Sequence, residues 1–256
     1  MKALVSFAYG VGVYVFFLAT FVYTIGFVGG VAVPKTIDSG PSGPLLPSLG
    51  VDFLLLGLFA VQHSVMARRA FKRWWTRIIA PAVERSTFVL ASTLALALLD
   101  WQWRPIAQPV AWDVGPGAAS LVLQALFWLG WAVLLLSTFL IDHFELFGLS
   151  QVYTGLTGRA IPAPEFRTPL FYRYVRHPIY VGFLLAFWAA PVMTAGHLLF
   201  SVACTGYILI GIWFEERDLI AQFGDRYRAY RRQVGMLVPL PARKTPEGAE
   251  SAKMGP

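Results

Sequence analysis

Charged residues are scarce in this chain. Only 14% of its 256 residues are Asp, Glu, Lys or Arg, whereas 57% are hydrophobic. A soluble domain of this length needs far more charged surface, and uninterrupted apolar runs of about 18 or more residues are typical of membrane-spanning helices. The scarcity of charge therefore excludes a soluble protein and predicts an all-α integral membrane protein.

Cysteine is nearly absent as well. The single cysteine, Cys204, lies inside an apolar run, which excludes a disulfide framework and suits a small packed side chain. We also expect no metal site. The net charge of +7 does not indicate a nucleic-acid partner, because the basic residues lie at the ends of apolar runs rather than on one soluble face.

The apolar runs predict six membrane spans. The last run, Ile179–Phe214, has 36 residues without one Asp, Glu, Lys or Arg. As a single helix it would extend roughly 54 Å, against a hydrocarbon core of about 30 Å. Pro191 and the sequence Thr194-Ala195-Gly196 supply a break near its middle, so we expect two short helices in a tight hairpin. The other four spans are expected at about 4–28, 51–67, 86–99 and 118–141.

The basic residues favour one orientation of these spans. Arg and Lys prefer the cytoplasmic side of short loops. Six spans place Lys2, the segments 68–85 and 142–178 and the tail from 215 onward on one side. That side then carries 19 of the 21 basic residues, which leaves Lys35 and Arg104 on the other. We therefore expect both termini in the cytoplasm.

A single membrane domain is expected over residues 1–240. Within it, the segment 151–169 is rich in proline and glycine and is typical of a loop. The last sixteen residues, 241–256, are polar and are predicted to form a disordered tail.

Polar residues bracket the last apolar run. YRYVRHPIYVGF opens it at Tyr172–Phe183, and a pair of glutamates closes it; the hairpin brings both to the same membrane face. Pro178 suits the first turn of a helix, which leaves His177 at the cap beside Arg176. The N-terminus of such a helix attracts carboxylates. Tyr180 follows on the first turn.

Each remaining residue of the bracket has a possible role in ligand binding. Gly182 would let a flat group approach the backbone. Glu215 and Glu216 can accept hydrogen bonds from the two hydroxyls of a ribose, and because consecutive helix residues point about 100° apart, we expect only one of them to face a ligand. A simpler hypothesis also fits, namely a positive membrane anchor followed by an interfacial helix whose arginines face lipid headgroups.

Further polar residues are expected at the same face. His63 lies at the end of the second predicted span, and Asp142, His143 and Glu145 lie at the end of the fourth. Ionisable groups inside spans are functional hypotheses by default, so we expect these residues to line a catalytic pocket, although a histidine on an apolar helix is often structural. His197 is predicted at the far face with a structural role.

The paired motif RHPIYVGF and EERDLIAQFGDRYRAYRRQV resembles the C-terminal core of the isoprenylcysteine carboxyl methyltransferase and phospholipid methyltransferase superfamily. Upstream, GLFAVQHSVMARRAFKRWW, ERSTFVL and IDHFELFGLSQVY are similar to bacterial membrane methanethiol S-methyltransferases and to NnrU-type membrane proteins. The resemblance implies an S-adenosyl-L-methionine-binding core at 172–239, in which His177, Tyr180, Glu215 and Glu216 contact the cofactor. It also implies methylation of methanethiol to dimethyl sulfide at the cytoplasmic face of a bacterial plasma membrane.

Three alternative functions stay open from the sequence, one of them a sterol-reductase-like use of the same C-terminal core. A methyltransferase for a lipid-like acceptor, such as a prenylcysteine carboxylate or a phospholipid amine, would need a lateral opening between helices. An NnrU-like or haem-containing redox membrane protein would need histidines on facing helices at similar depth. The oligomeric state is not predicted.

Overall fold

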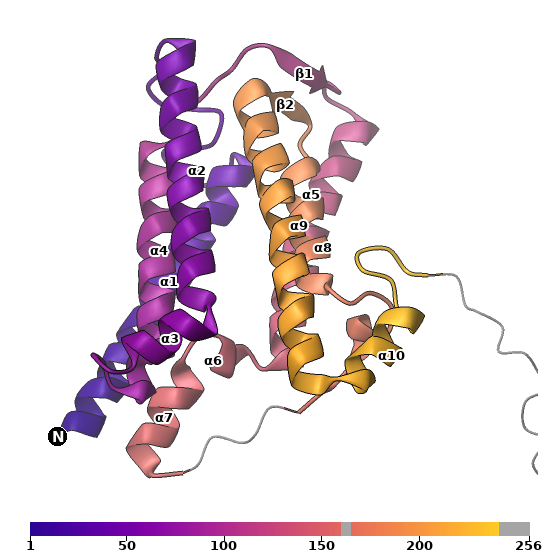
Figure 1. The fold of residues 1–256 in the computed structure, drawn as a ribbon. Helices are drawn as coiled ribbons and strands as arrows, with labels where there is room; N and C mark the ends of the chain where they lie inside the picture. Colours follow the sequence, from indigo (N-terminus) through magenta and orange to yellow (C-terminus); the bar gives the residue numbers. More distant parts are fainter. Residues whose placement is uncertain (160–164, 241–256) are drawn as a thin grey trace, which may run out of the picture.

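A bundle of helices forms nearly all of the structure, a computed structural model that describes residues 1–159 and 165–240 (Figure 1). The longer helices are α1 Lys2–Gly29, α2 Leu45–Ala67, α4 Pro81–Gln102, α5 Ala118–Ile141, α8 Pro178–Trp188 and α9 Ala195–Phe223. The short elements are α3 Arg69–Trp75, α6 His143–Leu146, α7 Leu149–Thr157, the 3₁₀ helix η1 Leu170–Arg173, α10 Asp225–Gln233, and the strands β1 Val110–Asp113 and β2 Val192–Thr194. The tail predicted to be disordered, 241–256, lies outside the described residues.

Five helices are long and apolar enough to cross a membrane: α1, α2, α4, α5 and α9. Helix α8 is apolar but has only 11 residues, or about 16 Å of helix, roughly half of a hydrocarbon core. The start of α1 and helix α10 lie at the same end of the bundle (Figure 1), as an even number of passes requires. The prediction of an all-α membrane protein is confirmed, with α8 as a shortened sixth pass.

The break in the last apolar run is confirmed, but its form differs from the prediction. Helix α8 ends at Trp188, and α9 begins after β2, where the Thr194 hydroxyl caps the helix by accepting a hydrogen bond from the His197 N–H. Strand β2 pairs antiparallel with β1, a pairing that the apolar sequence of β2 did not reveal. Helix α9 also continues to Phe223, so Glu215 and Glu216 lie inside the helix rather than at its end.

Helix α8 contacts α9, as expected for a hairpin, through a hydrogen bond from Trp188 to the Thr205 hydroxyl at 2.9 Å, and it also packs closely on α5. A Cβ atom on Gly182 would lie 2.6 Å from the Gly130 carbonyl oxygen, and one on Gly130 would lie 2.7 Å from the Gly182 carbonyl oxygen. Small residues allow such close approach of helix backbones within a membrane. Gly182 therefore has a packing role here, and the prediction that it opens the backbone to a flat ligand is not supported.

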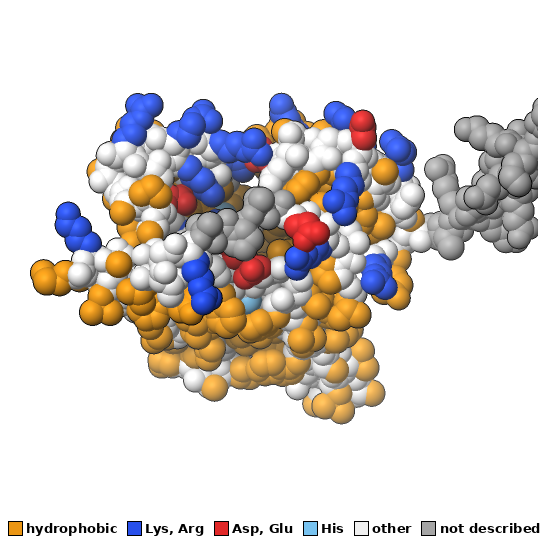
Figure 2. All heavy atoms as spheres, turned by 90° about the horizontal axis from the view of Figure 1, so that it is seen from below, with side chains coloured by type: hydrophobic (Ala, Val, Ile, Leu, Met, Phe, Trp, Pro, Cys, Tyr) orange, Lys and Arg blue, Asp and Glu red, His pale blue; other side chains and the backbone are white. Residues whose placement is uncertain are grey.

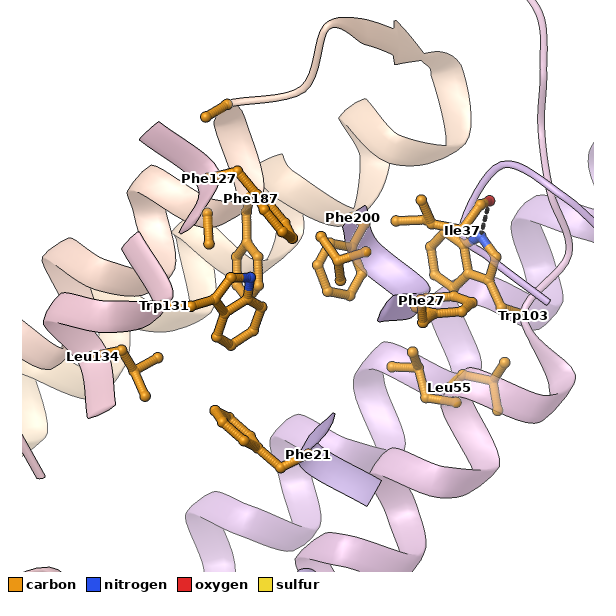
Figure 3. Close-up of a cluster of buried hydrophobic side chains, with 14 residues drawn as sticks. Phe21, Phe27, Ile37, Leu55, Trp103, Phe127, Trp131, Leu134, Phe187 and Phe200 are labelled. Carbon is orange, nitrogen blue, oxygen red and sulfur yellow. Dashed lines mark hydrogen bonds between the residues drawn. The ribbon is translucent and has the colours of Figure 1, made fainter. Parts of the chain in front are cut away.

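Aromatic side chains join the two halves of the bundle, α1, α2 and α4 on one side and α5, α8 and α9 on the other (Figure 3). Phe21 meets Trp131 edge-on at 5.3 Å between ring centroids. Phe200 contacts Phe187 at 5.0 Å and Trp103 at 5.8 Å. Because lipid is as apolar as these side chains, their contribution is close packing rather than removal from water.

Part of the predicted loop 151–169 is helical. Helix α7 continues to Thr157, and its Val152 is fully buried against α1, where a Cβ on Gly10 would lie 2.6 Å from a Val152 methyl group. The close packing of Val152 on Gly10 stabilises the helical conformation of this segment despite its glycine content.

The end of the bundle that carries β1 and β2 holds its own buried polar groups, which the sequence did not reveal. Asp52 accepts a hydrogen bond from the Arg104 N–H at 2.8 Å, and Asp100 accepts one from the Thr24 hydroxyl at 2.7 Å. Lys35 donates to the Trp101 carbonyl oxygen. Lys35 and Arg104, the two basic residues assigned to this side, thus both lie near buried carboxylates.

Candidate active site

The start of α8 is fixed by the chain that follows α10. The Arg176 N–H donates to the Gly235 carbonyl at 2.8 Å and the His177 N–H to the Met236 carbonyl at 3.2 Å. His177 occupies the cap position and Pro178 the first helical position, as the sequence predicted. Residues far apart in the chain therefore meet at the α10 end of the bundle.

Glu216 is locked by positive partners. The Arg176 guanidinium donates from Nε to Glu216 Oε1 at 2.7 Å, and its Nη2 lies 2.7 Å from the same oxygen. His177 Nε2 lies 3.3 Å from Oε1, and Arg231 Nη1 lies 3.5 Å from Oε2. Arg176 also donates to the Val234 carbonyl. A buried carboxylate needs such compensation, so the pair joins α8, α9 and the end of α10.

Glu215 lies in a different environment on the adjacent position of α9. Its side chain is 45% exposed and accepts a hydrogen bond from the Tyr180 hydroxyl at 3.0 Å through Oε2. His177 Nδ1 lies 3.7 Å from the same oxygen. Among the described residues, Oε1 of Glu215 has no partner. The two neighbouring glutamates thus present one occupied carboxylate and one available carboxylate.

The Arg176 guanidinium and the N-terminus of α8, both predicted to bind a ligand, already have partners within the protein. Arg176 is engaged by Glu216 and by backbone carbonyls, so its guanidinium is a structural tie. The helix N-terminus offers few free donors, because the Tyr180 and Val181 N–H groups both donate to the His177 carbonyl. Within the described residues, only Ile179 keeps an unpaired N–H in this first turn.

A cluster of tyrosines adjoins the two glutamates. Tyr230 donates to the Tyr172 carbonyl oxygen, and the Tyr172 hydroxyl donates to the Ser137 carbonyl at 3.4 Å. Burial, reinforced by the negative charge of Glu215, raises the pKa of Tyr172, and burial raises the pKa of Tyr230 to about 12. Burial raises the pKa of Tyr227 as well, reinforced by Glu216. These phenols are therefore neutral. Tyr172 and Tyr230 donate hydrogen bonds, whereas the Tyr227 hydroxyl has no partner among the described residues.

His63 lies in the wall between the two halves of the bundle. Its Nδ1 is 3.1 Å from the Ser92 hydroxyl, and its ring stacks on Phe59 at 5.4 Å. The ring of Tyr207, on α9, lies 6.5 Å away edge-on. Among the described residues, Nε2 of His63 has no hydrogen-bond partner. The contact of His63 with α9 and its unpaired Nε2 are thus compatible with the predicted role in lining a catalytic pocket.

The residues at the end of α5 have structural contacts. His143 is buried, and both its ring nitrogens are engaged, Nε2 by Tyr14 at 2.7 Å and Nδ1 by Thr138 at 2.8 Å. Burial lowers the pKa of His143, against the opposing charge of Asp142. Asp142 caps α6 by accepting from the Glu145 N–H at 2.9 Å, and the side chains of Asp142 and Glu145 are exposed. These contacts favour a role in stability.

His197 lies at the opposite end, where the sequence predicted a structural role. It is buried, with Nε2 3.1 Å from the Phe187 carbonyl and Nδ1 3.6 Å from Asp38. Both contacts are internal to the far end of the bundle.

Charged side chains are concentrated on the surface at the α10 end of the bundle. Figure 2 shows Lys and Arg side chains around this face, with Asp and Glu side chains nearer its middle and a histidine beside them. Arg68 contributes to this face, with its Nη1 3.6 Å from Asp218 and its guanidinium 4.6 Å from the centre of the Phe214 ring. This contact ties α2 to α9 at the edge of the candidate site.

Comparison with known proteins places the chain in a family. The chain is 56% identical over 245 residues to a methanethiol S-methyltransferase of Mycobacterium tuberculosis, covering 96% of this chain and 100% of the relative. It is 52% identical over 235 residues to methanethiol S-methyltransferase 1 of Bradyrhizobium diazoefficiens, covering 92% and 82%. A more distant relative is nurim of Rattus norvegicus, 32% identical over 183 residues, covering 68% and 69%. No family model and no solved structure matches. The chain belongs to the methanethiol S-methyltransferase family.

Proposed function

We propose that this protein transfers a methyl group from S-adenosyl-L-methionine to methanethiol and so forms dimethyl sulfide. The observation that carries the proposal is the contrast between the two glutamates, in which Glu216 is locked by Arg176 and Glu215 keeps a carboxylate oxygen available beside His177 and Tyr180. The relatives with at least 50% identity carry the name of this activity.

The residues at the α10 end fit this methyl donor. Glu215 can accept hydrogen bonds from the two ribose hydroxyls, which are donors that a carboxylate pairs with well. The Ile179 N–H and Arg231, whose side chain is 49% exposed, are candidates for the carboxylate of the amino-acid part. The donor supplies its methyl group on a positively charged sulfonium, which the negative charge of Glu215 also favours.

The protein's part in the reaction is to position the reactants and to remove one proton. Bringing an acceptor sulfur to about 3–3.5 Å from the methyl carbon, in line with the bond that breaks, supplies much of the rate. The thiol must also be deprotonated, since cysteine thiols titrate near pH 8.5. We assign His63 as the base: with Nδ1–H donating to Ser92, Nε2 carries the lone pair that accepts the thiol proton.

We place the site at the cytoplasmic face of a bacterial plasma membrane. The basic residues of the segment 68–85 and of α10 lie at the end that carries the two glutamates, and Lys and Arg prefer the cytoplasmic side. S-adenosyl-L-methionine is then supplied from the cytoplasm.

One observation favours a second candidate, a lipid-like acceptor. An apolar groove of about 520 Å³ runs between α5 and α8, lined by Leu126, Leu184, Trp188 and Leu237 among others. Leu237 follows Met236, whose carbonyl accepts from His177, so the groove begins beside the site. A prenyl or acyl chain would fit such a groove.

The test is expression in a host that lacks the activity, with methanethiol supplied and dimethyl sulfide measured in the headspace. Cells with the wild-type protein should produce dimethyl sulfide, and cells with Glu215→Gln should produce much less at equal protein level. Wild-type cells no better than the vector control would contradict the proposal. Transfer of labelled methyl to a prenylcysteine or phospholipid by the same membranes would support the second candidate instead.

A further inference from the structure

One face of α9 extends from the contact between the two halves of the bundle to the candidate site. Tyr207, Gly211 and Glu215 are spaced by four residues, so they lie on one stripe of the helix. The stripe extends about 12 Å from Tyr207 to Glu215. Tyr207 therefore lies deeper in the bundle than the available carboxylate, on the same side of the helix.

Gly211 leaves open space in the middle of this stripe. If a Cβ atom is placed on it, the Tyr180 hydroxyl lies 3.8 Å away; apart from the two adjacent residues and the backbone of α9 itself, no other atom of the described residues lies within 4 Å. Tyr180 is the residue that donates to Glu215. The space over Gly211 is thus bounded on one side by the Tyr180–Glu215 pair and on the other by Tyr207.

Tyr207 is held so that its own proton is available. The Ser64 hydroxyl donates to the Tyr207 oxygen at 3.3 Å. The Tyr207 ring packs edge-on against Phe59 at 6.3 Å and against His63 at 6.5 Å. A phenol has one proton to donate, and among the described residues no acceptor takes the proton of Tyr207.

We propose that the space over Gly211 is the subsite for the acceptor thiol, and that Tyr207 donates a hydrogen bond to the acceptor sulfur there. This inference rests on the proposed function. Hydrogen bonds to an ionised acceptor are about twice as strong as neutral ones, so Tyr207 stabilises the thiolate more than the thiol. Because Gly211 has no side chain, the floor of the subsite leaves room for the carbon substituent of a small thiol with one or two carbons.

The methyl transfer combines one proton transfer with one displacement at the methyl carbon. The thiol proton passes to Nε2 of His63, and the acceptor sulfur forms a bond to the methyl carbon. The bond from that carbon to the donor sulfonium breaks, and its electron pair stays on the donor sulfur, which becomes a neutral thioether. Tyr207 keeps its proton throughout and only donates a hydrogen bond.

The first test is Tyr207→Phe, which keeps the ring and removes the hydroxyl. With purified protein, we expect kcat/KM for methanethiol to fall roughly 10- to 100-fold, as for loss of a hydrogen bond to a charged group. Affinity for S-adenosyl-L-methionine should stay within twofold. The rising limb of the kcat–pH profile, which reports groups in the enzyme–substrate complex, should move to higher pH. Tyr23→Phe removes the phenol that bonds the Lys35 carbonyl at the opposite end and should match wild type.

The second test fills the space itself. Gly211→Ala meets only an ordinary contact with Tyr180, so it should fold normally and should reduce activity with ethanethiol more than with methanethiol. Gly211→Leu should abolish methylation of methanethiol while donor binding persists. The matched control is Gly206→Leu, because Gly206 lies on the same helix with open space around its Cβ position and is exposed; it should keep wild-type activity.

The outcomes separate this inference from the proposed function. A wild-type protein that makes no dimethyl sulfide overturns both. An active wild type overturns this inference alone if Tyr207→Phe keeps its kcat/KM for methanethiol and its pH profile, or if Gly211→Ala shows no change in preference between the two thiols. Loss confined to donor affinity in Tyr207→Phe also counts against it.

Discussion

The two ends of the bundle both hold buried carboxylates, but they hold them differently. At the β1–β2 end, Asp52 and Asp100 are buried and are bonded by a backbone N–H and a hydroxyl. At the α10 end, Glu216 is bonded by a guanidinium, while its neighbour Glu215 is partly exposed, and one of its oxygens has no partner in the described part of the chain. The first arrangement ties loops to helices, whereas the second locks one carboxylate and leaves the other available for a ligand.

The largest effect should come from removing the cation that locks Glu216. In Arg176→Met, the buried carboxylate loses its main partner, and breaking a buried pair costs about 3–5 kcal/mol. We expect a markedly lower midpoint of thermal unfolding in detergent and weaker donor binding. A variant as stable as wild type would mean that the ion pair does not hold α8 to α9.

Glu215→Gln should separate binding from stability at the same end. It removes the available carboxylate but keeps an acceptor for Tyr180, so unfolding should change little. Loss of charge-assisted hydrogen bonds of about 1.5–3 kcal/mol corresponds to a roughly 10- to 100-fold weaker affinity for S-adenosyl-L-methionine, measurable by calorimetry. Equal affinity in the variant and the wild type would remove Glu215 from the site.

His143 should make stability depend on pH without acting in catalysis. Its pKa is lowered by burial, so the unfolded chain binds more protons than the folded one below the ordinary histidine pKa of about 6.5. The contribution of neutral His143 is therefore complete above about pH 6.5 and is lost as the pH falls. Unfolding scans from pH 7.5 to 5 should show a smaller loss of stability in His143→Gln than in wild type. Identical slopes would contradict this assignment.

The smallest effect is expected at the β1–β2 end. Asp100→Asn keeps an acceptor for the Thr24 hydroxyl and should change the unfolding free energy by about 1 kcal/mol or less, with methyl transfer unchanged. If this variant instead lowered activity as strongly as Glu215→Gln, the distinction between the two ends would fail.

Much of the fold could be predicted from the sequence, because charge and helix-breaking residues act locally. Pro191 and the residues after it break the last apolar run in the structure as the pattern indicated. The distribution of arginines predicted that His177 and Glu215 would lie at one face, and the structure brings them within 3.7 Å. Such inferences need only helix lengths and the cost of charge in lipid.

What could not be predicted depends on contacts between distant residues. The bond of Arg176 to Glu216 spans 40 positions, and no local pattern distinguishes an arginine that binds a ligand from one that ties helices. The fit of Gly182 against Gly130 likewise requires knowing which helices meet. Tyr207 was missed because a tyrosine within an apolar run is typical of packing; only its bond to Ser64 and the open space over Gly211 distinguish it.

The most direct test is transfer of isotope-labelled methyl from S-adenosyl-L-methionine to methanethiol by the purified protein, with wild type and Glu215→Gln at equal concentration. The wild type should release labelled dimethyl sulfide, and the variant should release roughly 10- to 100-fold less at low donor concentration, in line with its lost hydrogen bonds. Absence of labelled dimethyl sulfide from a folded wild-type protein that binds the donor would contradict the proposed activity.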